Sequence, residues 1–413
     1  MPAEKKYGFT TSVLHSDRSK SIEHGSLHRP VHTSATFSYA SASELAAVFQ
    51  GKQPGYRYAR QGNPTVGALE DKINRMEDGV ATTCFASGMA AIGSLFQSLL
   101  KAGDHVVSSV FLFGNTRYQW NTIAGLGVDV DFVDATDVAQ VEKALRPTTR
   151  MVFVETIANP RTQIADLEKI GKLCQEKGIL LAVDNTMTSP WLFRPKSIGA
   201  ALSINSLTKF IGGHGNAMGG SVTDTGVFDW DRYPNIAEGF KKLPASQRGN
   251  AQIRTRALRD FGACLGPESA HHIAVGAETL ALRMERSCAN ALALANMLQT
   301  EKAVTAVYYP GLPSHPQHDL ASRLFGGFGG MLSFEIDEKA DLFACLNRLK
   351  IGIFASNLGD TRTLVNPVAH TIYYDMSDAA KKEQGIASSL VRVSVGIEDT
   401  QDLLDDFHQA LST

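Results

Sequence analysis

The chain has 413 residues, which at about 150 residues per domain corresponds to two or three domains. Lysine and arginine number 40 and aspartate and glutamate 42, so a net charge of −2 gives no basic excess for nucleic-acid binding. No apolar run is long enough to cross a membrane, the five scattered cysteines favour neither disulfides nor zinc, and residues 1–7 lack the apolar core of a signal peptide. We therefore expect a soluble cytoplasmic enzyme without nucleic-acid or membrane partners and without a metal site.

The first 62 residues show little hydrophobic periodicity, and the Ser/Thr-rich stretch 33–43 predicts an irregular arm. Because such an arm cannot bury a core of its own, we expect it to pack on a neighbouring subunit. The pattern changes at Asn63, where Asn-Pro followed by apolar residues at helical spacing predicts a capped helix that ends before Gly79.

Between residues 63 and 258, short apolar runs alternate with amphipathic segments. The runs predict strands over 106–107, 128–133, 151–155 and 179–184, with helices over 138–145 and 167–177. Strands that alternate with helices in this way form βαβ units and a mostly parallel sheet. Strands that are apolar throughout fit a sheet covered on both faces. We therefore predict an α/β domain over 63–258.

The pattern changes again from about residue 259. Residues 270–299 are rich in Ala, Leu and Met and predict one long helix. Further structured segments are predicted over 329–336, 340–349, 352–356 and 390–395, followed by an amphipathic helix over 399–411. These elements favour a smaller, largely antiparallel α+β domain over 259–413.

Two polar residues end successive apolar runs. Asp184 follows the run 180–183, and Lys209 follows Ser206 and Thr208 at the end of the next run. An amine beside hydroxyls at a strand end suits a Schiff base with pyridoxal phosphate, whose ring nitrogen would pair with the carboxylate. Singly, each residue has an ordinary explanation, since Asp184 could cap a turn and Lys209 could extend to solvent. Together they favour the cofactor site.

A third element is the start of a small-residue helix at Ser87-Gly88. Free backbone N–H groups and the positive end of a helix dipole form a potential anion site there. An ordinary helix start with close packing explains the same residues equally well.

These segments resemble the γ-family of pyridoxal-phosphate-dependent enzymes of cysteine and methionine metabolism. The matching motifs are 58–65 (YARQGNPT), 87–89 (SGM), 155–160 (ETIANP), 184–186 (DNT), 206–214 (SLTKFIGGH), 356–360 (SNLGD) and 391–396 (VRVSVG). The resemblance implies the type I fold of these transferases, which is like that of aspartate aminotransferase. That fold has a mostly parallel seven-stranded sheet and a smaller α+β C-terminal domain.

The resemblance also implies residue roles. Lys209 would carry the cofactor and move protons, Asp184 would meet the ring nitrogen, and Asn159 would lie near the phenolic oxygen. The residues expected at the phosphate are Gly88, Met89, Ser206 and Thr208, with Tyr58 and Arg60 from a neighbouring subunit.

At the substrate, the resemblance implies that Arg392 holds the α-carboxylate as a bidentate fork, with Asn357 nearby. Tyr58 is a second candidate, besides Lys209, for proton transfer at Cβ. The implied assembly is a homotetramer built as a pair of dimers, in which each active site is shared between subunits.

Phe113 is a departure from the family pattern, which usually has a tyrosine over the cofactor ring. Phenylalanine can stack on the ring but has no proton to give. A thiolate leaving group benefits from an acid at this position, whereas acetate or succinate leaves as a stable anion. Phe113 therefore favours an O-acylhomoserine substrate and resembles the O-succinylhomoserine sulfhydrylase branch.

Two other segments depart from the pattern. Ser356 stands where cystathionine-cleaving members often have a glutamate, so it cannot pair with a distal ammonium. The stretch 365–374 (VNPVAHTIYY) is also unusual, and its His370, Tyr373 and Tyr374 could reshape the substrate mouth.

The predicted reaction is γ-replacement on O-succinyl- or O-acetyl-L-homoserine by sulfide or another thiol. The product is homocysteine or cystathionine, as in methionine biosynthesis. The alternative is a methionine or cystathionine γ-lyase, which forms α-ketobutyrate, ammonia and a thiol. A third possibility, a cofactor-binding protein without catalysis, is disfavoured because Lys209 and Arg392 are both present.

Overall fold

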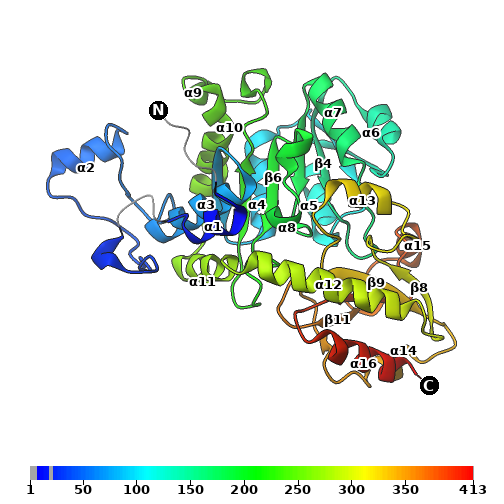
Figure 1. Cartoon of the computed structure of the whole chain (residues 1–413). Helices are drawn as coiled ribbons and strands as arrows, with labels where there is room; N and C mark the ends of the chain where they lie inside the picture. The colour runs from blue at the N-terminus through cyan, green and yellow to red at the C-terminus, as the bar shows by residue number, and fades with distance from the viewer. Residues whose placement is uncertain (1–6, 18–21, 413) are drawn as a thin grey trace.

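The computed structural model describes residues 7–17 and 22–412 (Figure 1). Two sheets, of seven and five strands, are joined along the chain by the long helix α12 (Leu280–Leu298), and the arm that contains α2 (Ala42–Phe49) extends away from both. Among the described residues, no helix combines the length and apolar character needed to cross a bilayer.

The larger sheet has the strand order β1-β7-β6-β5-β4-β2-β3. Its strands are β1 (Ala81–Phe85), β2 (His105–Ser109), β3 (Asp129–Val133), β4 (Thr149–Glu155), β5 (Leu180–Asp184), β6 (Leu202–Ser206) and β7 (Gly220–Asp224). Only β7 runs antiparallel to its neighbours β1 and β6. The predicted α/β class with a mostly parallel seven-stranded sheet is therefore confirmed.

Both faces of this sheet are covered, because successive side chains of a strand point to opposite faces. On β4, Val152 and Val154 belong to one core, which includes helices α3, α7, α11 and α12. Met151 and Phe153 belong to a second core on the other face, with α4, α5 and α10. The continuous apolar runs in the sequence follow from this double burial.

The smaller sheet has the strand order β10-β11-β12-β9-β8 and is antiparallel except for the pair β10 and β11. Its strands are β8 (Val304–Tyr308), β9 (Met331–Ile336), β10 (Ile353–Phe354), β11 (Leu364–Pro367) and β12 (Leu390–Ser394). A third core packs α12 and α16 (Thr400–Leu411) against this sheet.

The remaining helices connect the strands or flank the sheets. They are α1 (Phe9–Leu14), α3 (Pro64–Glu77), α4 (Gly88–Leu99), α5 (Gly114–Ala124), α6 (Val138–Ala144), α7 (Leu167–Lys177), α8 (Ser189–Leu192), α9 (Glu238–Lys241), α10 (Ala245–Ile253), α11 (Pro267–Ala277), α13 (His318–Leu324), α14 (Leu342–Leu346) and α15 (Asp378–Glu383).

Two expectations about helices need correction. The predicted helix 270–299 is two helices, α11 and α12, separated at Glu278 and Thr279. The hydroxyl of Thr279 and the guanidinium of Arg283 both donate to the carbonyl of Gly276. These side-chain bonds compete with the backbone hydrogen bonds that a continuous helix would need. The arm is also not wholly irregular, since the start of α2 is capped. The hydroxyl of Ser41 accepts from the N–H of Glu44, and the carboxylate of Glu44 accepts from the N–H of Ala40.

Candidate active site

A cavity of about 440 Å³ lies beyond the carboxyl ends of β4, β5 and β6, where α/β sheets place their ligands. The predicted site residues that line it are Gly88, Met89, Phe113, Asn159, Asp184, Ser206, Thr208, Lys209, Asn357 and Arg392. The sheets therefore bring together residues that are up to about 300 positions apart in the sequence, as Arg392 on β12 shows.

Lys209 lies in the turn directly after β6. Its Nζ donates to Oδ1 of Asn357 at 2.5 Å. Burial and, to a smaller extent, the positive charge of Arg392 together lower the pKa of Lys209 to about 8. A lysine with this pKa has an appreciable neutral fraction near physiological pH, as a nucleophilic amine requires.

Asp184 and Glu155 end neighbouring strands and are paired in register. Burial raises the pKa of both carboxyls, and the charge of Asp184 raises the pKa of Glu155 further. A cation beside Asp184 would offset the cost of burying its negative charge, and the protonated ring nitrogen of pyridoxal phosphate is such a cation. The carboxyl pair therefore fits the cofactor.

The start of α4, where the sequence predicts the phosphate site, borders the cavity. Ser87 caps the helix by accepting a bond from the N–H of Ala90 at 3.1 Å, and the first N–H groups of the helix have no intrahelical partner. A side chain at Gly88 would come within 2.8 Å of Cβ of Ser206, so glycine allows the turn and β6 to approach closely. The hydroxyl of Thr208 is bonded to the backbone of Gly219, which holds the Ser-x-Thr-Lys turn in place.

Arg392 is 2% exposed, yet its guanidinium reaches the cavity. Nη2 donates to the carbonyls of Ser356 and Asn357, at 3.0 Å each, and Nη1 donates to Oδ1 of Asn159 at 3.3 Å. Among the described residues its Nε has no hydrogen-bond partner. Burial lowers the pKa of Arg392 to about 10, which still leaves it protonated at neutral pH. A buried cation with an unused N–H is suited to a carboxylate ligand.

Phe113 lies at the start of α5, and its ring is 37% exposed at the cavity. Its backbone N–H donates to Oε1 of Glu155 at 2.7 Å. Glu155 therefore ties Phe113 to the strand beside Asp184. The sequence analysis gave Glu155 no role, although a carboxylate at the end of an apolar strand was the same signal that singled out Asp184.

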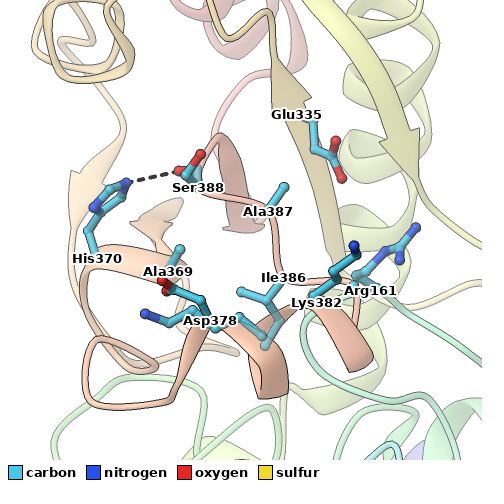
Figure 2. Close-up of a pocket in the computed structure, with 11 residues that line it drawn as sticks. Arg161, Glu335, Ala369, His370, Asp378, Lys382, Ile386, Ala387 and Ser388 are labelled. Carbon is cyan, nitrogen blue, oxygen red and sulfur yellow. Dashed lines mark hydrogen bonds between the residues drawn. The ribbon is translucent and has the colours of Figure 1, made fainter.

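The segment after β11 contributes differently from the expectation for 365–374. Ile372, which had not been singled out, lines the cavity. Tyr373 is buried behind it, with its hydroxyl donating to the carbonyl of Asn159 at 3.3 Å. Tyr374 is 74% exposed, and His370 does not line this cavity but bonds the carbonyl of Ser388 at 2.9 Å (Figure 2).

Tyr58 and Arg60 lie outside the cavity of their own chain. Tyr58 is 44% exposed, and the guanidinium of Arg60 lies over its ring and donates to the carbonyl of Arg259. Within one chain, these two residues therefore do not reach the other site residues.

Comparisons with known proteins agree with this geometry. Residues 10–412 match the family model described as Cys/Met metabolism PLP-dependent enzyme. An L-methionine gamma-lyase of Fusobacterium nucleatum subsp. polymorphum is 37% identical over 411 residues, and a homocysteine/cysteine synthase of Saccharomyces cerevisiae is 34% identical over 433 residues. In both cases the alignment covers 98% of this chain and 98% of the relative.

A solved structure of a putative O-acetylhomoserine (thiol)-lyase from Campylobacter jejuni subsp. jejuni matches the fold with a TM-score of 0.92 and 28% identity. The match covers 98% of this chain and 100% of that one, which contains N'-pyridoxyl-lysine-5'-monophosphate. The relatives thus include both lyases and synthases.

Proposed function

The chain belongs to the pyridoxal-phosphate-dependent enzyme family of cysteine and methionine metabolism, and from this premise we propose that it catalyses γ-replacement on an O-acyl-L-homoserine. Its cofactor is pyridoxal phosphate, and its substrate is a small amino acid. We propose that sulfide or a thiol displaces the succinyl or acetyl group, with homocysteine or cystathionine as the product.

When bound, the cofactor supplies an electron sink that stabilises negative charge at the substrate's Cα. Asp184 would keep the ring nitrogen protonated, and Asn159 would lie at the ring's phenolic oxygen. The phosphate would lie at the start of α4, against Gly88 and Ser206.

Lys209 would move protons at the substrate's Cα and Cβ, for which its lowered pKa is suited. The hydrogen bond from its Nζ to Asn357 holds the amine at the cavity. Arg392 would accept the α-carboxylate and so fix the substrate's orientation. Because the neighbouring Asn357 carbonyl accepts from Arg392, the carboxylate site and the proton-transfer site share one short segment of backbone.

The observation that carries the choice of substrate is Phe113. Its ring borders the cavity without a hydroxyl, so no acid stands there to protonate a departing thiolate. A carboxylate leaves without this help. Ser356, which also lines the cavity, brings no charge for the distal ammonium of cystathionine.

The second candidate is γ-elimination from methionine or cystathionine. It is favoured by the similarity to L-methionine gamma-lyases, which is as strong as the similarity to homocysteine synthases. Both reactions use the same cofactor and the same lysine, so the products distinguish them.

The test is product analysis with O-acetyl- and O-succinylhomoserine, each with sulfide, with cysteine and with no thiol. The proposal expects homocysteine or cystathionine as the main product when a thiol is present, and little turnover of methionine. If α-ketobutyrate and ammonia dominate even with sulfide, or if methionine is cleaved as fast as the acyl group is replaced, γ-elimination is the main reaction and the γ-replacement proposal is wrong.

We further propose that Tyr58 and Arg60 complete the phosphate site of a neighbouring subunit within a homotetramer. Their position near the end of the N-terminal arm, whose helix α2 extends away from both sheets, supports this proposal (Figure 1). The inactive variants Arg60→Ala and Lys209→Ala, mixed under conditions of verified subunit exchange, should regain part of the activity, because one site of the hybrid is intact. No recovery would show that the sites are not shared.

A further inference from the structure

Another cavity, of about 510 Å³, lies between α15 and Glu335 near the end of β9, apart from the catalytic cavity (Figure 2). The charged residues that line it are Arg161, Glu335, Asp378, Lys381 and Lys382. Arg161, Lys382 and Glu335 lie on one side, and His370 lies on the opposite side. The apolar part of the lining is made by Ala369, Ile386 and Ala387.

The positive charges of this cavity are incompletely matched. The guanidinium of Arg161 lies 4.2 Å from the centre of the Tyr308 ring, and its Nε is buried without a hydrogen-bond partner among the described residues. With the side chains that the structure describes, neither Arg161 nor Lys382 forms an ion pair. Glycine at position 385 leaves room for the guanidinium, because a Cβ there would clash with Nη1 of Arg161.

Of the two carboxylates in the lining, Glu335 lies on the same side as Arg161 and Lys382, and Asp378 is the other. The one considered for the ligand is Glu335. Its Oε1 accepts a bond from the hydroxyl of Tyr308 at 2.7 Å, and the carboxylate has no cation partner among the described residues. Tyr308 thus stands between Arg161 and Glu335 and keeps the two charges apart. A simple anion in this cavity would face Glu335, and a simple cation would face Arg161 and Lys382. A zwitterion can pair with the cations and with the carboxylate at once.

We propose that this cavity binds a free α-amino acid with a short apolar side chain. The α-carboxylate binds between Arg161 and Lys382, and the α-ammonium binds Glu335. The side chain lies against Ala369, Ile386 and Ala387. This ligand class uses the unmatched cations, the carboxylate and the apolar lining together.

The occupant is positioned to influence catalysis, because two backbone segments border both cavities. In the first, Asn159 lines the catalytic cavity and Arg161 lines the second cavity. In the second, Ile372 lines the catalytic cavity and Ala369 lines the second. Tyr373 joins the two segments, since it packs in one apolar cluster with Ala369 and donates to the carbonyl of Asn159. The proposal therefore includes a change in substrate affinity when the second cavity is filled.

The binding test uses holoenzyme in which borohydride has reduced the bond between cofactor and lysine, so that an amino acid cannot displace Lys209. Calorimetry with L-norleucine, which has no group to lose at Cγ, should show saturable binding at one site per chain. Hexanoate lacks the ammonium and pentylamine lacks the carboxylate. Each should bind at least about tenfold more weakly, since a hydrogen bond to a charged group contributes about 1.5–3 kcal/mol.

Two variants assign the site. Arg161→Met removes the cation, and Ala387→Phe fills the cavity while leaving every charge in place. Each should weaken norleucine binding at least about tenfold. Lys172→Met, which removes a charge from the exposed face of α7, is the matched control and should bind as the wild type does. Absent binding, or binding that both site variants retain, would overturn the proposal. Retained cofactor absorbance and circular dichroism show that each variant is folded.

The coupling test measures the KM for the amino-acid substrate with and without L-norleucine. Norleucine also competes at the catalytic site, but this competition is common to wild type and Arg161→Met. If norleucine changes the KM of the wild type and of Arg161→Met by factors that differ at least twofold, the difference is due to binding in the second cavity. Identical effects would overturn the effector role. The binding test involves no turnover, so its outcome does not depend on the proposed acyl substrate.

Discussion

Two sets of buried polar side chains lie beside the strands β4, β5 and β6, and the first of them lines the catalytic cavity. The first set is Asp184, Glu155 and Lys209 at the carboxyl ends of the strands. The second set surrounds Glu77, at the end of α3, whose side chain is fully buried. In both sets burial moves the pKa of the acids upward, for Glu77 to about 7.

The sets differ in how their polar atoms are used. Oε1 of Glu77 accepts from the side chains of Asn205, Ser203 and Asn185, at 2.6, 2.9 and 3.4 Å, so the carboxyl ties α3 to β5 and β6. At the cavity, by contrast, Lys209 and Arg392 present donors that can turn to a ligand. A shifted pKa therefore reports burial in both places, and the open cavity with convergent donors is what indicates chemistry.

The largest effect is expected for Lys209→Ala, which removes the amine from the cavity set. We expect turnover to fall by about 10²–10⁴-fold, the usual contribution of a positioned proton-transfer group, together with loss of the absorbance of the lysine-bound cofactor. Lys196→Ala, at an exposed ion pair with Asp78, is the control. A variant that retains this absorbance would show that another lysine binds the cofactor.

Arg392→Lys keeps the positive charge but removes the planar guanidinium that can donate two parallel hydrogen bonds to a carboxylate. Because lysine cannot form the bidentate pair, kcat/KM should fall roughly 10–100-fold, from loss of a charged hydrogen bond of about 1.5–3 kcal/mol. Most of the loss should appear in KM, with the cofactor spectrum unchanged. Arg286→Lys, at the exposed pair with Asp399, tests the same exchange outside the site. An unchanged KM would mean that Arg392 does not hold the carboxylate.

Phe113→Tyr adds an acid beside the cofactor. It should raise γ-elimination from methionine or cystathionine by ~10-fold or more, the low end of what a positioned acid contributes. Replacement on O-acylhomoserine should change little, because its leaving group hardly needs a proton. The measurement is the ratio of the two kcat/KM values. If this ratio is the same in variant and wild type, Phe113 does not set the leaving-group preference.

The smallest effect on activity is expected for Glu77→Gln. The pKa of Glu77 is raised from 4.5 to about 7 on folding, so between these pH values the native state binds more protons than the unfolded state. Stability from this group is therefore present below pH 4.5 and is lost as the pH rises to about 7.

Glutamine does not titrate, so the free energy of unfolding of Glu77→Gln, relative to wild type, should be more favourable at pH 8 than at pH 5. Denaturant titrations at the two pH values measure this difference, and Glu142→Gln on α6 makes the same chemical change outside the network. A difference that does not vary with pH would refute the role given to Glu77.

Much of the large sheet was predictable because its signals are local. Asn63 caps α3 through bonds to the N–H groups of Thr65 and Val66, and α7 begins and ends at the predicted residues. The apolar runs before Asp184 and Lys209 are the predicted strands. Caps and periodicity act within a few residues, so they can be recognised without knowledge of the rest of the chain.

The sequence by itself thus determined the alternation of strands and helices and the family to which these motifs belong, and it singled out Lys209 and Asp184 as the candidates for binding the cofactor. Only the tertiary structure decided that β7 enters the sheet between β1 and β6, that Glu155 holds Phe113, and that Tyr373 packs with Ala369 and donates to the carbonyl of Asn159. These features depend on contacts between distant segments. Their energy comes from burial and from hydrogen bonds that do not exist until the chain has packed, so no local pattern records them.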